Sequence, residues 1–299
     1  MSETTNTAAP SAPLPITVVP VRHYGRWVSG AVVLVALAAL IYAFAQADIA
    51  YDQTLHFFTA ETIVGGMVGT LAISVAAQAL GILLGVGAAV MRLSPNPVMQ
   101  AVAGGYIWLF RGTPVLVQLL LWYNLSLVFP EVGIPGLGTV ETNSLMTPFV
   151  AALLGLGINE GAYMAEIVRA GILSVDKGQV EAAHALGMKR GKTMRRIVLP
   201  QAMRVIVPPT GNEFINMLKT SSLAYAITYG ELLQSAVRIY SNNLLVVELL
   251  LTISMWYLVL TTVFSIGQYF VERRFQYSST GEATAVAAVL KRILPGRTR

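Results

Sequence analysis

Long apolar stretches separated by short polar segments divide this sequence. Residues 27–47, 62–91 and 249–271 contain no charged side chain, and each stretch is long enough for a helix to cross a hydrocarbon core of about 30 Å. Residues 104–129 and 147–172 are also mainly apolar, although charged residues interrupt them. The pattern therefore predicts a protein built from membrane-spanning helices.

Prolines and glycines mark where these helices should break. Pro95 and Pro97 predict a turn after the second stretch, because proline lacks an amide donor and restricts the residue before it. Arg-Gly-Thr-Pro at 111–114 interrupts the third stretch. Two prolines and a glycine within 208–211 predict an irregular fifth span over about 210–233. We therefore expect an all-α integral membrane protein with about six transmembrane helices.

Composition agrees with a membrane protein and removes several other classes. The chain is 55% hydrophobic and 12% charged with a mean hydropathy of +0.64, whereas soluble domains carry about 25% charged residues. The net charge of +5 does not indicate nucleic acid, because basic cytoplasmic loops account for it. Cysteine is absent, and His23, His56 and His184 lie in different segments, so neither a metal site nor a catalytic triad is expected.

The distribution of basic residues predicts the orientation. Seven of the twenty Lys and Arg residues lie between Lys177 and Arg204, which places this loop in the cytoplasm. Six spans then leave both termini in the cytoplasm, as tails over 1–24 and 277–299, with the first expected to be disordered. A signal peptide is the alternative for the first apolar stretch, but its length exceeds a usual signal h-region and favours a retained helix.

Two patterns in the basic loop fail on their spacing. Residues 187–193 resemble a P-loop, but three residues separate the glycines where four are required, and no strand precedes them. Glu181 and His184 have the Glu-x-x-His spacing of di-iron bundles, yet a second pair and two further glutamates are missing. We expect no ATP site, metal site or catalytic residue in the chain. A basic lipid-binding helix remains an alternative for residues 188–196.

A short helix with a docking surface is the better prediction for the start of this loop. Glu181, three alanines and Leu186 favour helix, and Gly187 should end it. Such a helix presents a small, flat alanine surface that can seat in a groove on a partner.

Residues 181–200 resemble the cytoplasmic signature of bacterial ABC importer permeases. In that signature Glu-Ala-Ala is followed after three residues by Gly and after nine more by Ile-x-Leu-Pro. The residues that carry it here are Glu181, Ala182, Ala183, Gly187, Ile197, Leu199 and Pro200. Further segments resemble the polar amino acid (histidine-, glutamine- and glutamate-type) permeases: 110–118 (FRGTPVLVQ), 162–169 (AYMAEIVR), 177–179 (KGQ) and 271–274 (VERR). The resemblance covers residues 60–276.

The resemblance implies a five-helix type I permease domain at 60–276 in the bacterial inner membrane, to which residues 25–50 add an N-terminal transmembrane helix. The coupling loop at 177–204 is then expected to bind the ATPase, which pulls the helices between inward and outward states. The implied partners are two ABC ATPase subunits, a second permease subunit in a homodimer or heterodimer, and an extracytoplasmic amino-acid-binding protein. ATP and Mg²⁺ would act in the ATPase subunits, and this chain would hold no cofactor.

Ionisable residues inside the predicted spans are candidates for the substrate pathway, because burial of an unpaired charge costs several kcal/mol. An amino acid brings an ammonium and a carboxylate, which Glu160 and either Arg111 or Lys219 can receive. The alternative is that Glu160 pairs with one of these bases to stabilise the helix bundle. For Arg111 the structural role is the preferred interpretation.

Other polar residues are weaker candidates or have local roles. Asn159, Asn212 and Glu213 lie beside predicted helix breaks, where polar side chains often line cavities. Glu166 and Arg169 are three residues apart and are expected to pair on one helix. Where many permeases of this family have Lys-Asp-Thr-Ser-Leu, this chain has Lys-Thr-Ser-Ser-Leu at 219–223, which removes a possible acidic partner of Lys219.

Two other functional classes remain to be compared with the importer permease. A secondary transporter or channel without ATP would also use buried charges, but it predicts inverted repeats, and the hydrophobic pattern shows none. A membrane-embedded enzyme lacks a nucleophile–base pair or metal cluster. The sequence does not distinguish a cationic from an anionic amino acid substrate.

Overall fold

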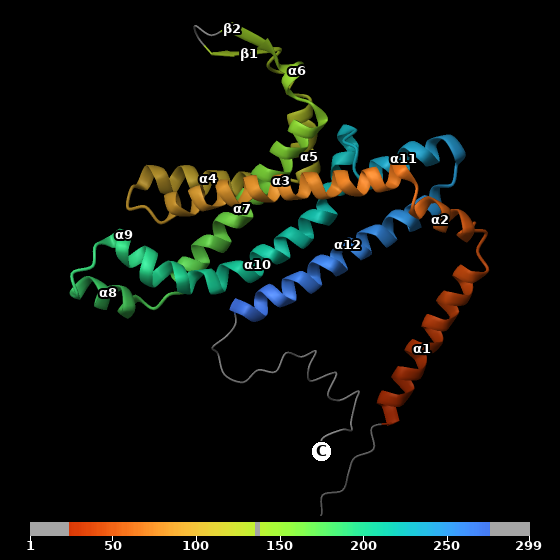
Figure 1. Cartoon of the computed structure of the whole chain (residues 1–299), viewed down its shortest axis with the longest axis horizontal. Helices are drawn as coiled ribbons and strands as arrows, with labels where there is room; N and C mark the ends of the chain where they lie inside the picture. Colours follow the sequence, from red (N-terminus) through yellow and green to blue (C-terminus); the bar gives the residue numbers. More distant parts are fainter. Residues whose placement is uncertain (1–23, 135–137, 276–299) are drawn as a thin grey trace, which may run out of the picture. The chain divides into compact units, whose positions relative to one another are not determined.

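The computed structural model describes residues 24–134 and 138–275, so the tails expected at the two termini lie outside it apart from Tyr24 (Figure 1). The chain divides into two compact units, residues 1–49 and 50–299, which we describe separately. The described residues of the first unit contain one helix, α1 (Tyr24–Ala45). None of its 22 residues is buried, and its surface is apolar along its length.

The second unit is helical apart from one β-hairpin, within the part of the chain that the structure describes. Its longer helices are α3 (Glu61–Arg92), α4 (Pro97–Gly112), α7 (Pro148–Leu173), α10 (Leu199–Thr220), α11 (Leu232–Asn243) and α12 (Val246–Phe275). Its shorter elements are α2 (Tyr51–Phe58), α5 (Val115–Tyr123), η1 (Leu125–Leu127), β1 (Glu131–Ile134), β2 (Gly138–Glu141), α6 (Thr142–Leu145), α8 (Lys177–Ala185), α9 (Arg190–Thr193), the π-helical turn η2 (Met194–Val198) and the 3₁₀ segment η3 (Ser221–Ile227).

The all-α membrane prediction is confirmed. Among the described residues, α1, α3 and α12 are each long and apolar enough to cross a membrane by length and composition. Helices α7 (26 residues) and α10 (22 residues) are long enough to cross a membrane, but both are less apolar because they carry charged side chains. The candidate site lies at charged side chains of these two helices.

Helices α3 and α7 pack closely because glycines lie at their contact. A Cβ added at Gly81 would lie 2.8 Å from the Cβ of Glu160, and one at Gly85 would lie 2.9 Å from the backbone nitrogen of Ala165. On α7, a Cβ added at Gly157 would lie 2.7 Å from Cδ2 of Leu80 on α3. The small residues Ala77, Gly81 and Gly85, spaced four apart on α3, therefore serve helix packing within the chain.

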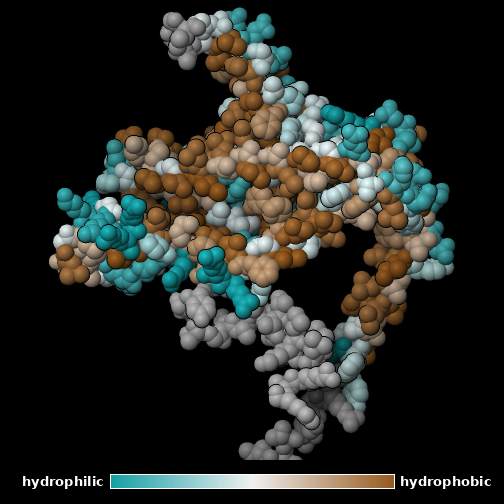
Figure 2. All heavy atoms as spheres, in the orientation of Figure 1, coloured by the Kyte–Doolittle hydropathy of each residue, from teal (hydrophilic) through white to brown (hydrophobic). Residues whose placement is uncertain are grey.

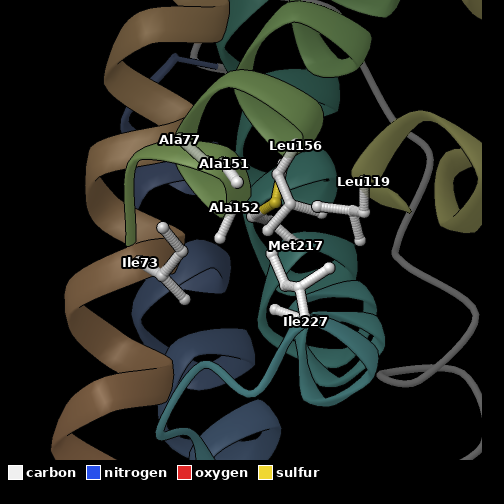
Figure 3. Packing of buried hydrophobic residues seen from close by; sticks show 9 residues of the cluster. Ile73, Ala77, Leu119, Ala151, Ala152, Leu156, Met217 and Ile227 are labelled. Atoms are coloured by element: carbon white, nitrogen blue, oxygen red, sulfur yellow. The ribbon is translucent and has the colours of Figure 1, made fainter. Parts of the chain in front are cut away.

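A buried apolar cluster joins α3 and α7 to the elements that follow them. Figure 3 shows Ile73 of α3, Leu119 of α5 and Leu156 of α7 directed toward Met217 of α10 and Ile227 of η3. Close packing of side chains from five elements fixes the spacing between α5, α7 and α10.

The predicted fifth span is wrong in its boundaries. Helix α10 begins at Leu199 and continues through Pro208 and Pro209 to Thr220, whereas the irregular backbone comes later, in η3 and at Thr228, which has φ 61°. Gln268 of α12 donates from Nε2 to the carbonyl oxygen of Pro208 at 2.9 Å, so α12 contacts α10 beside its two internal prolines. Pro200 lies in the first turn of α10, where proline is readily accommodated.

Other predicted boundaries are confirmed more closely. The break at 111–114 separates α4 from α5, and the predicted turn precedes α4, where Asn96 Oδ1 accepts from the Val98 amide at 2.9 Å. Helix α4 nevertheless starts at Pro97, earlier than the expected 104, because proline fits the first helical position.

Three elements between the spans were not predicted. The loop after η1 contains the antiparallel hairpin of β1 and β2, in which Glu131 pairs with Glu141 and Val132 with Val140. Helix α11 occupies residues expected to be partly loop, including Arg238. Helix α2 is held on α12 by backbone contacts from Ala50, Thr54 and Phe58 to the side chains of Glu248, Thr252 and Trp256, at 3.1, 3.0 and 2.9 Å.

The surface reflects this division between apolar helices and polar ends. Figure 2 shows apolar side chains along the long helices of the second unit, whereas hydrophilic side chains gather over α8 and α9, at the left of the view. The basic loop is thus a distinct polar region next to apolar helices.

The contact between α3 and α7 can be tested with two glycines of α3 that lie two residues apart, one facing α7 and the other facing away from it. Gly85→Val should destabilise the protein by about 1–3 kcal/mol, because the new side chain overpacks the α7 backbone. Gly87→Val is the matched control, since a Cβ there would meet nothing within 4 Å. Thermal unfolding followed by tryptophan fluorescence in detergent measures both, and equal melting temperatures would contradict the packing account.

Candidate functional site

A charged cavity of about 380 Å³ lies between α5, α7 and α10. Its lining residues are Val115 of α5, Leu156, Asn159, Glu160 and Tyr163 of α7, and Glu213, Asn216, Met217, Lys219 and Thr220 of α10. The structure therefore brings together four of the sequence candidates: Asn159, Glu160, Glu213 and Lys219.

Glu160 is the most buried charged residue of this cavity, with 5% of its surface exposed. Its Oε1 accepts a hydrogen bond from Gln78 Nε2 of α3 at 3.3 Å. Among the described residues, neither Arg111 nor Lys219 lies within ion-pair distance of Glu160, so the pairing that would have made Glu160 purely structural is not observed. Its carboxylate keeps hydrogen-bonding capacity for a ligand.

Asn159 shapes the wall of the cavity through its side-chain amide. Its Nδ2 donates to the carbonyl oxygen of Phe110 at 2.6 Å and to Gln118 Oε1 at 3.3 Å. Gln118 in turn donates to the carbonyl oxygens of Phe110 and Thr113, at 3.0 and 3.1 Å. These bonds satisfy backbone groups freed where α4 breaks before Pro114, and they tie the break to α7.

The remaining pathway candidates differ in position. Lys219 is exposed in the single chain and Glu213 is half-buried, so the cavity is open on the side of α10. Asn212 is exposed and is not among the lining residues. Arg111 does not line the cavity, but its Cζ lies 4.9 Å from the ring centroid of Tyr163, which does. Arg111 is thus a neighbour of the cavity, held by a cation–π contact.

Three polar lining residues were missed from the sequence. Tyr163 lies one turn after Glu160 on α7, and Asn216 and Thr220 follow Glu213 at helical spacing on α10. Their positions at i+3 and i+7 from acidic residues would have indicated a common helix face, had α10 been predicted as regular helix through its prolines.

The basic loop begins with α8, the short helix expected from the alanine-rich sequence. Asp176 caps its start by accepting from the Gly178 amide at 2.7 Å. Gly187 has φ 77°, and the amides of Gly187 and Met188 donate to the carbonyl oxygens of His184 and Ala183 at 2.9 and 3.0 Å. This is the Schellman arrangement that ends a helix at a left-handed glycine, so the predicted role of Gly187 as helix terminator is confirmed.

The signature residues of this loop divide into exposed and buried sets. Glu181, Ala182, Gly187, Leu199 and Pro200 are exposed, Ile197 is half-buried, and Ala183 is buried with 4% of its surface exposed. Ala183 therefore supports α8 from beneath, whereas the exposed residues are available to a partner.

Leu186 was considered in the sequence only as a helix-favouring residue, yet 83% of its surface is exposed. A fully exposed leucine on a polar loop is the kind of apolar anchor that protein interfaces bury.

One local prediction near these sites is confirmed. Arg169 Nη2 lies 2.7 Å from Glu166 Oε2, a pair on one helix face. His184 is exposed on α8, with Nδ1 3.1 Å from the carbonyl oxygen of Met188. Within the described residues, no group of three or more His, Asp or Glu is placed to hold a metal ion.

A mainly helical membrane fold, a charged cavity between its helices and a basic loop with an exposed short helix are together typical of a transport permease. Residues 81–277 match the family model for the binding-protein-dependent transport system inner membrane component, and the chain belongs to this family. It is an ATP-driven ABC importer permease subunit, a multi-pass protein of the bacterial inner membrane.

Curated relatives share most of the chain. It is 44% identical to the arginine transport system permease protein ArgU of Corynebacterium glutamicum, over 93% of this chain and 89% of the relative. It is 34% identical to the glutamine transport system permease protein GlnP of Escherichia coli K12, over 72% of this chain and 93% of that protein. The alternative of a secondary transporter or channel is not supported by these relatives.

Solved structures agree with the fold. A chain in the crystal structure of an amino acid ABC transporter with histidines is 39% identical, with a TM-score of 0.63, over 71% of this chain and 94% of the other. A chain of the inward-facing MetNI methionine ABC transporter has a TM-score of 0.59 at 18% identity, which shows a shared fold alone. Members of this family work with ATPase subunits and a substrate-binding protein.

The end of α8 can be tested at Gly187. Gly187→Val should loosen the C-terminal turn, because a branched residue in the left-handed region costs about 1–2 kcal/mol, whereas Gly187→Asn should largely preserve it. Hydrogen exchange of peptides covering residues 177–190 should then be about 5- to 30-fold faster in the valine variant. Equal exchange in the two variants would contradict the assigned cap.

Proposed function

We propose that this permease imports a polar amino acid with a cationic side chain, for which arginine is the test ligand. The observation that carries the proposal is the charge of the cavity, which has two carboxylates, Glu160 and Glu213, and one ammonium, Lys219. An amino acid with a cationic side chain has the complementary set of two cations and one carboxylate. A neutral or acidic amino acid would leave at least one cavity carboxylate without a cationic partner.

The geometry suggests a role for each charged residue. Lys219, at the end of α10, receives the carboxylate of the ligand, Glu213 receives its ammonium, and Glu160 receives its side-chain cation, each through charge-assisted hydrogen bonds. Tyr163, Asn216 and Thr220 offer further hydrogen-bonding groups. The cavity volume of about 380 Å³ falls at the lower end of pockets for small ligands, which run from about 300 to 1,000 Å³.

The relatives support a substrate of this kind. The 44% identical relative is named for arginine transport, and the 39% identical chain comes from an amino acid transporter with histidines. The glutamine permease is 34% identical, so the comparisons also include a neutral substrate.

The coupling loop at 177–204 is proposed to transmit ATP-driven motion. The exposed face of α8, with Glu181, Ala182 and Leu186, has the size and character of a segment that seats in a cleft of the ATPase. ATP and Mg²⁺ then act in the partner, and the permease itself performs no hydrolysis. Ile197, Leu199 and Pro200 connect this contact to α10 and thus to the cavity.

The assembly that follows is the one implied by the family. Two ATPase subunits bind two permease subunits, either identical or homologous, and an extracytoplasmic binding protein delivers the amino acid. The permease domain spans residues 60–276, the helix within 25–50 precedes it, and both termini lie in the cytoplasm. The basic residues of the coupling loop support this orientation.

Glu160→Gln tests the cavity. Loss of a charge-assisted hydrogen bond costs about 1.5–3 kcal/mol, so arginine should bind roughly 10- to 100-fold more weakly to the purified permease–ATPase complex. Glu166→Gln is the matched control on the same helix, because its carboxylate pairs locally with Arg169. Direct binding of radiolabelled arginine, glutamine and glutamate measures the effect and the specificity. Unchanged arginine affinity in Glu160→Gln would remove Glu160 from the site.

Leu186→Ser tests the ATPase contact. It should lower arginine-stimulated ATP hydrolysis and uptake at least fivefold through loss of about 1–2 kcal/mol of apolar burial, while thermal stability stays unchanged because the side chain is exposed. Leu127→Ser is the control, since that leucine is 81% exposed and lies in η1, outside the loop. Normal coupling in Leu186→Ser would place the ATPase contact elsewhere.

A further inference from the structure

Gln78, a buried residue of α3, contacts Glu160, which lines the cavity. We propose that Gln78 is a positioning residue that holds Glu160 toward the cavity and thereby sets the preference for a cationic ligand. The inference rests on the proposed function of the cavity. Gln78 itself does not line the cavity, so it acts through Glu160.

Both donor positions of Gln78 point at α7. Its Nε2 lies 3.3 Å from Glu160 Oε1 and 3.8 Å from the sulfur of Met164, one turn further along the helix. Only 6% of the Gln78 surface is exposed, so water does not compete with these contacts. A neutral amide donor steadies one carboxylate oxygen of Glu160 without neutralising its charge, and the other oxygen is left for the ligand.

The position of Gln78 is set by the backbone contact between the two helices. Gly81 follows it on α3, where a Cβ would lie 2.5 Å from Cγ of Glu160. Ala77 precedes it and is fully buried. Small residues on both sides therefore bring the α3 backbone close enough for the glutamine side chain to reach Glu160, and they leave it little freedom to turn away.

One feature of Gln78 does not fit a purely structural role. Its Oε1 is buried and has no hydrogen-bond partner among the described residues. A buried acceptor without a donor destabilises a fold, and an apolar side chain of the same length would avoid that cost. The amide nitrogen of Gln78 faces Glu160, because the opposite orientation would place the amide oxygen beside a carboxylate oxygen, and both are hydrogen-bond acceptors. The unpartnered oxygen is therefore a consequence of directing the amide nitrogen at Glu160.

Gln78→Met separates the two roles, because methionine has nearly the same length and no donor. In the full permease–ATPase complex in lipid nanodiscs, the variant should bind radiolabelled arginine about tenfold more weakly, the equivalent of roughly 1.4 kcal/mol. Binding of glutamine should change less than twofold. Thr70→Val is the matched control on α3: it removes a buried hydroxyl that accepts from the Leu232 amide at 3.2 Å, so it should lower stability without changing the arginine-to-glutamine ratio.

The double variant Gln78→Met/Glu160→Gln supplies the decisive comparison. If Gln78 acts through Glu160, adding Gln78→Met to Glu160→Gln should leave arginine affinity within twofold of Glu160→Gln alone. Three results would overturn the inference: unchanged arginine binding in Gln78→Met, an equal loss for arginine and glutamine, or a further tenfold loss in the double variant. If Glu160→Gln alone has no effect, the proposed function of the cavity fails first, and the single variants distinguish that outcome.

Discussion

Close backbone contact between α3 and α7 is the interaction on which the rest of this permease depends. Glycines on both helices, Gly81 and Gly85 on one side and Gly157 on the other, let the two backbones approach without intervening side chains. Because lipid is as apolar as the helices, such packing, and not the hydrophobic effect, holds them together in a membrane. It also buries Glu160 and Gln78 against each other, in an environment where a polar group requires a partner.

Helix α7 connects the two functional regions of the chain. Its middle supplies Glu160 and Tyr163 to the cavity, and it ends at Leu173, close before α8 begins at Lys177. On the other side of the loop, η2 continues without a break into α10, which supplies the rest of the cavity. A displacement of α8 by an ATPase would therefore act on both cavity walls through short rigid connections, as an alternating-access transition requires.

The sequence predicted the parts of this structure that depend on local chemistry. The length of the uncharged apolar stretches predicted α3 and α12. Gly187, which adopts the left-handed conformation, correctly predicted the end of α8. The charge of Glu160 within an apolar span identified it as a candidate. The sequence could not predict α10 correctly, because whether a membrane helix continues through Pro208 and Pro209 depends on its surroundings in the folded protein, where Gln268 of α12 contacts the Pro208 carbonyl. Gln78 was missed for the same reason: an uncharged glutamine in an apolar helix gains its role only from what packs against it.

The most direct test of this account is the location of the ligand. A cryo-electron microscopy structure of the permease–ATPase complex saturated with arginine should show the amino acid in the cavity between α7 and α10. Its carboxylate should lie near Lys219, with its cationic groups at Glu160 and Glu213. Arginine bound at another place in the membrane domain, with these three side chains directed away from it, would contradict the account.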